Sequence, residues 1–70
     1  MNPTLRQFAA FVQVARLGSF ARASDALGLS QPALSQSIAQ MEQLLGARLF
    51  TRTTRAVELT REGALLLPRA

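Results

Sequence analysis

Three glycines divide the first two thirds of the chain into segments that each have the apolar spacing of a helix. Gly18, Gly28 and Gly46 each follow such a segment, and glycine readily adopts the left-handed conformation that ends helices. A hydroxyl side chain that can cap a helix N-terminus precedes each segment, at Thr4, Ser19 and Ser30. These signals predict three short helices, over about 5–17, 20–27 and 31–45.

Size and composition narrow the function before any motif is considered. Seventy residues are enough for one small domain. The chain has no Cys and no His, which excludes a disulfide, an ordinary zinc site, a thiol nucleophile and the usual general base. We therefore expect neither an enzyme nor a bound cofactor. The longest apolar runs are far shorter than the ~20 residues of a membrane span, so we expect a cytoplasmic protein with no membrane partner.

Apolar residues at spacings of three and four predict the core face of each helix. The first helix is predicted to pack through Leu5, Phe8, Val12 and Ala15, with Phe11 widening the stripe. The second and third helices are predicted to pack through Phe20, Ala23, Ala26 and Leu27 and through Leu34, Ile38, Met41 and Leu45. The short connection between these two helices favours a steep crossing angle.

The opposite face of the third predicted helix is polar but uncharged. At about 100° per residue it presents Pro32, Ser35, Gln36, Ala39, Gln40 and Gln43, with Gln31 at its N-terminal end. No charge occurs between Gln31 and Met41. A solvated helix face more often carries Glu and Lys, whereas amides and hydroxyls are groups that read the edges of DNA bases. The pattern favours a DNA-reading surface, and an inert polar face is the alternative.

After Gly46 the apolar spacing changes from that of a helix to that of strands. Residues 57–60 alternate apolar and polar, which predicts two short strands around a turn. Arg48, Arg52 and Arg55 lie within eight residues that contain no acid. Folding does not require like charges to gather at a turn, so an external anion explains the cluster. A solvated loop is the alternative.

The charge of the whole chain also favours an anionic partner. Its net charge is +4, from eight basic residues, all of them Arg, and four acids. The planar guanidinium group suits phosphates and guanine edges better than a point charge does, which favours nucleic acid as the partner. A genome rich in GC would also raise the Arg content, without any such role.

The last ten residues begin a fourth helix. Thr60 can cap it, and Glu62 lies in the first turn, where the helix dipole favours a negative charge. Three successive leucines follow, and they cannot all face the core of one small domain: Leu65, Leu66 and Leu67. We therefore expect them to serve dimerisation, or the chain to continue beyond its last residue.

This order of elements predicts a mainly α fold, a winged helix-turn-helix with a three-helix core and a two-stranded wing. The domain is predicted over 1–60, with the helix-turn-helix at about 20–39 and the wing at about 48–60, and 61–70 starts a linker or dimerisation helix. In such modules the second helix of the motif enters the major groove, and the wing grips the backbone or minor groove. The predicted base contacts are Gln31, Pro32, Ala33, Ser35, Gln36 and Gln40. The predicted backbone or minor-groove contacts are Ser19, Arg22, Ser30, Arg52, Thr53, Thr54 and Arg55.

Two stretches resemble the N-terminal DNA-binding domain of LysR-type bacterial transcriptional regulators: GSFARASDALGLSQPALSQSI and LGARLFTRTTRAVELTREG. The resemblance covers about 5–67 and implies sequence-specific binding of double-stranded DNA at promoter sites. It implies base contacts by Gln31, Pro32, Ser35 and Gln36 and wing contacts by Arg52 and Arg55. It also implies a homodimer, weak in so short a chain, an operator with imperfect two-fold symmetry, and a small inducer that binds a C-terminal domain absent here.

The chain departs from the LysR pattern at two positions. Gln36 stands where the family commonly has Arg, which implies a different preferred base, and Ala56 stands where Gly is common in the wing. A winged helix that contacts protein through its Leu-rich fourth helix is the alternative function. A minimal hydrolase has almost no support, because Ser19 has no base to activate it.

Overall fold

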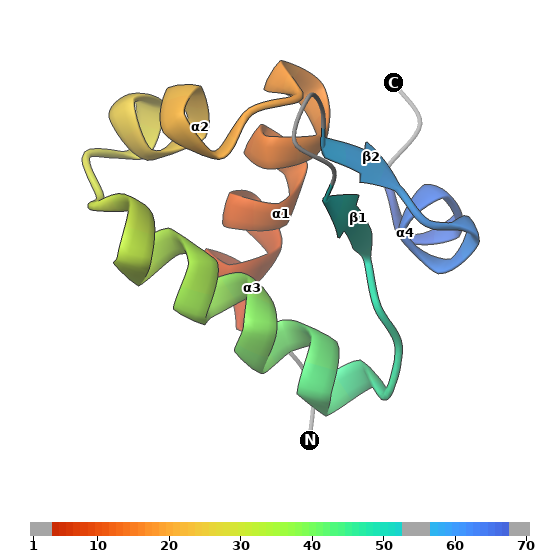
Figure 1. Cartoon of the computed structure of the whole chain (residues 1–70). Coiled ribbons are helices and arrows are strands. Elements are labelled where there is room, and N and C mark those ends of the chain that lie inside the picture. Colours follow the sequence, from red (N-terminus) through yellow and green to blue (C-terminus); the bar gives the residue numbers. More distant parts are fainter. Residues whose placement is uncertain (1–3, 53–56, 68–70) are drawn as a thin grey trace.

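The computed structural model describes residues 4–52 and 57–67. Three helices precede a two-stranded antiparallel sheet and a short fourth helix (Figure 1). Their bounds are α1 Leu5–Leu17, α2 Phe20–Leu27, α3 Gln31–Leu45, β1 Phe50–Arg52, β2 Val57–Leu59 and α4 Arg61–Leu66. The predicted mainly α, winged helix-turn-helix architecture is confirmed. Within the described residues, no helix is both long and apolar enough to cross a membrane.

The predicted caps explain where the helices begin and end. A hydroxyl side chain accepts a backbone hydrogen bond at the start of every one of these four helices, at Thr4, Ser19, Ser30 and Thr60. The first three helices end at left-handed glycines with φ angles of 64°, 69° and 68°, at Gly18, Gly28 and Gly46. Local sequence therefore sets the lengths of the helices and the tight turn between α2 and α3.

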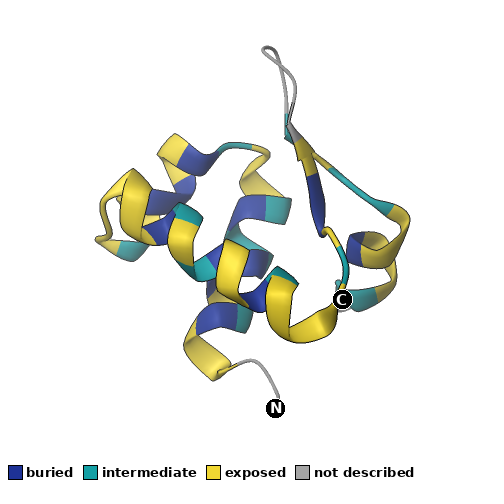
Figure 2. Cartoon of the chain, turned by 60° about the horizontal axis from the view of Figure 1, so that its bottom comes forward, coloured by how far each residue is buried: buried dark blue, intermediate teal, exposed yellow. Residues whose placement is uncertain are grey.

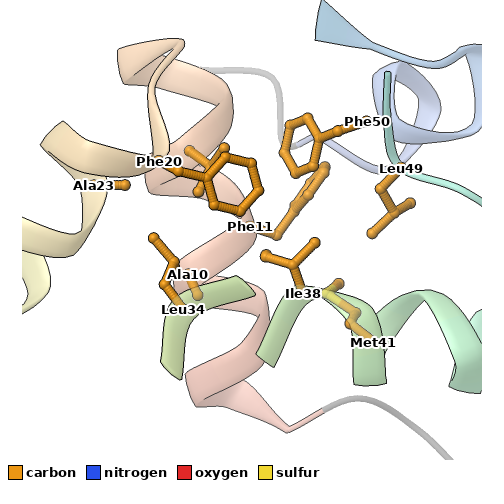
Figure 3. Packing of buried hydrophobic residues seen from close by; sticks show 10 residues of the cluster. Ala10, Phe11, Phe20, Ala23, Leu34, Ile38, Met41, Leu49 and Phe50 are labelled. Carbon is orange, nitrogen blue, oxygen red and sulfur yellow. The ribbon is translucent and has the colours of Figure 1, made fainter. Parts of the chain in front are cut away.

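The hydrophobic core lies where α1, α2, α3 and the wing meet (Figure 3). Phe11 is fully buried, and its ring centroid lies 5.5 Å from that of Phe50 in β1. The ring of Phe20 meets Phe50 edge-on at 6.0 Å. Tilted and edge-on ring pairs are favourable geometries. This cluster of three rings joins the wing to both α1 and α2.

The wing strands follow the alternation that their sequence predicts. Phe50 pairs with Leu59, and both side chains pack in or against the core. Thr51 pairs with Glu58, and both of these are exposed. The inward residues tie the sheet to the helices while the outward ones meet solvent, as a sheet with one buried face requires.

The predicted core face of α1 is wrong by roughly a third of a turn. Leu5 is 84% exposed, and Phe8, Val12 and Ala15 are half-buried at the edge of the core. The structure buries Phe11 as predicted, but together with Gln7, Ala10 and Val14. Helix α1 packs against α2, α3 and the wing at once, so more than one side of it meets protein. Spacing alone could not identify the most buried side.

Two smaller errors concern the other helices. In α2, Phe20 and Ala23 are buried as predicted, but Ala26 is exposed and Ser24 is buried instead. Burial of Ser24 is possible because its hydroxyl donates to the carbonyl of Ala21 at 2.8 Å. In α3, Leu34, Ile38 and Met41 are buried as predicted, whereas Leu45 is 40% exposed because the helix ends there.

Candidate nucleic-acid interface

The outward face of α3 is the candidate reading surface. Leu34, Ile38 and Met41 hold the opposite face in the core, so the helix cannot rotate without unpacking. The structure exposes Gln31, Pro32, Ala33, Gln36 and Gln40, and leaves Ser35 half-buried. Figure 2 shows this division along the helices, with blue ribbon toward the interior and yellow ribbon toward solvent. The residues predicted to read bases thus share an accessible, uncharged side of a fixed helix.

Two of the predicted backbone contacts also cap helices. The hydroxyl of Ser19 accepts from the N–H of Arg22 at 3.1 Å, and that of Ser30 accepts from the N–H of Ala33 at 3.2 Å. A hydroxyl that accepts in this way retains one O–H donor, which suits a phosphate oxygen. The side chain of Arg22 is exposed on α2. These three residues therefore lie at or near the N-termini of α2 and α3.

The predicted wing contacts lie mostly outside the described residues. Thr53, Thr54 and Arg55 are in the segment between the strands that is not described, and Arg52 is placed only as the last residue of β1, opposite Val57. Their position relative to Gln36 stays a prediction. The structure does establish that β1 and β2 are bound to the helix-turn-helix through Phe50.

Gln7 is a residue of this region that the sequence analysis missed. It is only 9% exposed, and its side-chain Nε2 donates to Oε1 of Gln40 on α3 at 3.3 Å. Its own Oε1 accepts from the N–H of Thr4 at 2.9 Å. The spacing of Thr4 and Gln7 is that of a capping box, so the sequence did carry a signal for the local bonds. It carried none for the partner on α3.

Glu42 was also missed, and it connects the end of α3 to the wing. Its Oε2 accepts from the N–H of Leu49 at 2.8 Å and lies 3.5 Å from Nε of the exposed Arg48. The backbone carbonyl of Glu42 accepts from Ala47 at 3.2 Å. One residue of α3 thereby fixes the loop that leads into β1.

Thr60, between β2 and α4, also binds the segment that leads into β1. Its backbone N–H donates to the carbonyl of Leu49 at 3.0 Å, and its hydroxyl donates to the carbonyl of Arg48. The same hydroxyl accepts from the N–H of Gly63 at 3.0 Å. The end of α3, the base of the wing and the start of α4 are therefore joined through residues 48 and 49.

Replacing Glu42 with Ala should lower the free energy of unfolding by about 1–3 kcal/mol, because the N–H of the buried Leu49 loses its acceptor. Urea unfolding followed by circular dichroism measures the loss. Glu42→Gln is the matched control, since it keeps an acceptor oxygen and gives up only the ion pair with the exposed Arg48, worth about 1 kcal/mol. Equal losses in the two variants would contradict a structural role for the bond to Leu49.

The family model described as bacterial regulatory helix-turn-helix protein, lysR family, matches residues 5–64. The chain belongs to the LysR family. That match spans α1, the helix-turn-helix, the wing and most of α4.

Individual LysR-family relatives agree in sequence and in fold. The HTH-type transcriptional regulator IlvR of Caulobacter vibrioides is 53% identical over 64 residues, which are 91% of this chain and 22% of IlvR. The oxidized form of Corynebacterium glutamicum OxyR superposes with a TM-score of 0.94 and 43% identity over 97% of this chain and 22% of that one. The BenM DBD complexed with catB site 1 DNA gives 0.86 and 40% identity, covering 90% of this chain and 70% of that one.

The relatives' names also describe the class of protein. They are regulators of transcription, so this is a regulatory family and not a family of enzymes. The chain spans about a fifth of the length of IlvR, the relative described above.

Proposed function

We propose that this LysR-family domain binds double-stranded DNA at promoter sites and reads its sequence with the N-terminal half of α3. The observation that carries the proposal is the exposed, uncharged amide-and-hydroxyl face of α3, which the core holds in one orientation. Structures with the same fold include complexes of the BenM DBD and of CbnR with DNA, at 40% and 36% identity.

Different residues serve affinity and specificity in this proposal. The N-terminal part of α3 enters the major groove, where Gln31 and Gln36 contact base edges. Arg22 and the wing residues Arg52 and Arg55 contact phosphates or the minor groove, which positions the domain without reading sequence. Because α3 is uncharged from Gln31 to Met41, the salt dependence of binding should arise outside the reading surface.

The same proposal predicts how the domain assembles and where in the cell it acts. Leu65 on α4 is 77% exposed, whereas Leu66 and Leu67 partly pack against the core, so Leu65 offers the apolar surface for a second copy. A homodimer would place two α3 helices on an operator with imperfect two-fold symmetry. We assign no cofactor to this domain and place inducer binding elsewhere in the protein. We expect the domain to act in the bacterial cytoplasm, at the nucleoid.

Replacing Gln36 with Ala should weaken binding to the preferred site by about 1–3 kcal/mol and relax base preference at one position of each half-site. Selection of bound sites from a random DNA pool, followed by titration of the winning site, measures both effects. Gln43→Ala is the matched control. It removes an exposed amide from the same helix, about 10 Å further along the axis from the N-terminal end.

Replacing Arg22 with Ala should instead weaken binding evenly across sequences and flatten the plot of log affinity against log salt by about 1 unit. A selected sequence profile that stays the same in the Gln36 variant would refute base reading by that residue. Failure of the unaltered domain to select any sequence would refute the proposed function and favour protein contact.

A further inference from the structure

We propose that Gln7, a residue of α1, determines which polar group Gln40 presents to DNA. The proposal rests on the DNA-binding function proposed above and deepens it. The side chain of glutamine carries an acceptor oxygen and a donor NH₂ group, and rotation of the amide exchanges their positions. Gln40 is exposed on α3 one helical turn beyond Gln36, so the orientation of its amide affects what α3 can read.

The capping box at the start of α1 fixes the orientation of Gln7. The backbone N–H of Thr4 can only donate, so the Gln7 atom that it meets at 2.9 Å must be the oxygen Oε1. The hydroxyl of Thr4 accepts from the N–H of Gln7 at 3.1 Å, which completes the box. The Nε2 group of Gln7 is therefore left for α3, and Gln7 is largely buried between the helices.

The orientation of Gln7 in turn fixes that of Gln40. Nε2 of Gln7 donates to Oε1 of Gln40 at 3.3 Å, and a donor there excludes the rotated amide, whose NH₂ group would face another NH₂ group. The NH₂ group of Gln40 is left to meet a partner outside the protein. Gln40 should thus act toward DNA as a donor.

A donor group narrows what Gln40 can recognise. It fits an acceptor on DNA, which is a phosphate oxygen or a base acceptor such as O6 or N7 of guanine or O4 of thymine. The two-bond contact of glutamine with adenine needs the amide oxygen to face the base together with the NH₂ group, whereas Oε1 of Gln40 is turned toward Nε2 of Gln7. Gln7 is accordingly a positioning residue for the contact of Gln40 with DNA, although it lies on α1.

Replacing Gln7 with Glu should reverse the orientation of Gln40. Glu is a preferred residue at this position of a capping box and favourable in the first turn of a helix, so the fold is expected to be retained, which thermal unfolding checks. Glu has no donor, and its carboxylate accepts from the NH₂ group of Gln40, which turns Oε1 of Gln40 outward. Site selection from a random DNA pool compares the variant with the unaltered domain.

The selected sites show whether the acceptor that Gln40 meets belongs to a base or to a phosphate. If Gln40 contacts a base, preference at one position should move from guanine or thymine toward adenine or cytosine, which carry donors in the major groove. If it contacts a phosphate, affinity should fall about 2- to 10-fold on every sequence and the base profile should stay the same.

The added charge of Glu could itself lower affinity, so Gln7→Glu is repeated in a Gln40→Ala background. A change that acts through Gln40 should disappear there, whereas a direct charge effect should persist. Equal effects in the two backgrounds would overturn the proposal while leaving DNA binding intact. Absence of any site selection by the unaltered domain would instead refute the proposed function.

Discussion

Phe11→Ala is expected to leave most of the domain unfolded at 25 °C. Phe11 is fully buried, and its ring packs against those of Phe8 and Phe50. Truncation of a buried Phe lowers the free energy of unfolding by about 3–5 kcal/mol, which is about all that the core of so small a domain provides. Far-ultraviolet circular dichroism should show loss of helix, and DNA binding should disappear with it.

Leu5→Ala is the matched control on the same helix. Leu5 was predicted to face the core, but it is 84% exposed, so its truncation should change the free energy of unfolding by less than about 0.5 kcal/mol. A loss as large as that of the Phe11 variant would mean that the buried face of α1 is misassigned.

Gly63→Ala is expected to destabilise the domain by about 1–3 kcal/mol, although Ala is the better helix former. A Cβ atom at position 63 would overlap the carbonyl oxygen of Leu49 and lie 2.9 Å from a methyl carbon of Leu59. The first obstacle is backbone, so α4 would have to move away from the wing. Urea unfolding measures the change, and the amide signals of Thr60 and Gly63 should shift if the two elements separate.

Ala64→Gly is the control for helix propensity. It makes α4 less favourable by about 1 kcal/mol, at an exposed position next to Gly63 where no side chain is added. Greater stability in Gly63→Ala than in the unaltered domain would show that α4 can shift at little cost and would refute the close packing of α4 on the wing.

The elements of the fold could be predicted because their signals are local. A hydroxyl cap, a run of three or four apolar residues on one face and a glycine stop lie at or within a single helix, and the structure places α1, α2 and α3 at the bounds that these signals predict. The exposed side of α3 was also predictable, because Leu34, Ile38 and Met41 leave no doubt about its core face.

The rest depends on contacts between distant residues. The buried side of α1 is set by three neighbours that its own sequence does not specify. Gln7 and Gln40 are 33 positions apart, and each amide taken alone is an ordinary polar residue. Glu42 resembles a solvated acid near a helix end, and only the path of the loop into β1 reveals that its carboxylate accepts from Leu49.

One hydroxyl group couples α4 to the rest of the domain. Thr60 Oγ1 bonds to Arg48, ahead of β1, and to Gly63 in α4. A torque applied to α4 would therefore reach the segment that leads into β1, and through the bond between Leu49 and Glu42 it would reach the C-terminal end of α3. Bending of α4 relative to the rest of the domain is opposed at its first turn, so α4 and α3 should move together as one rigid unit.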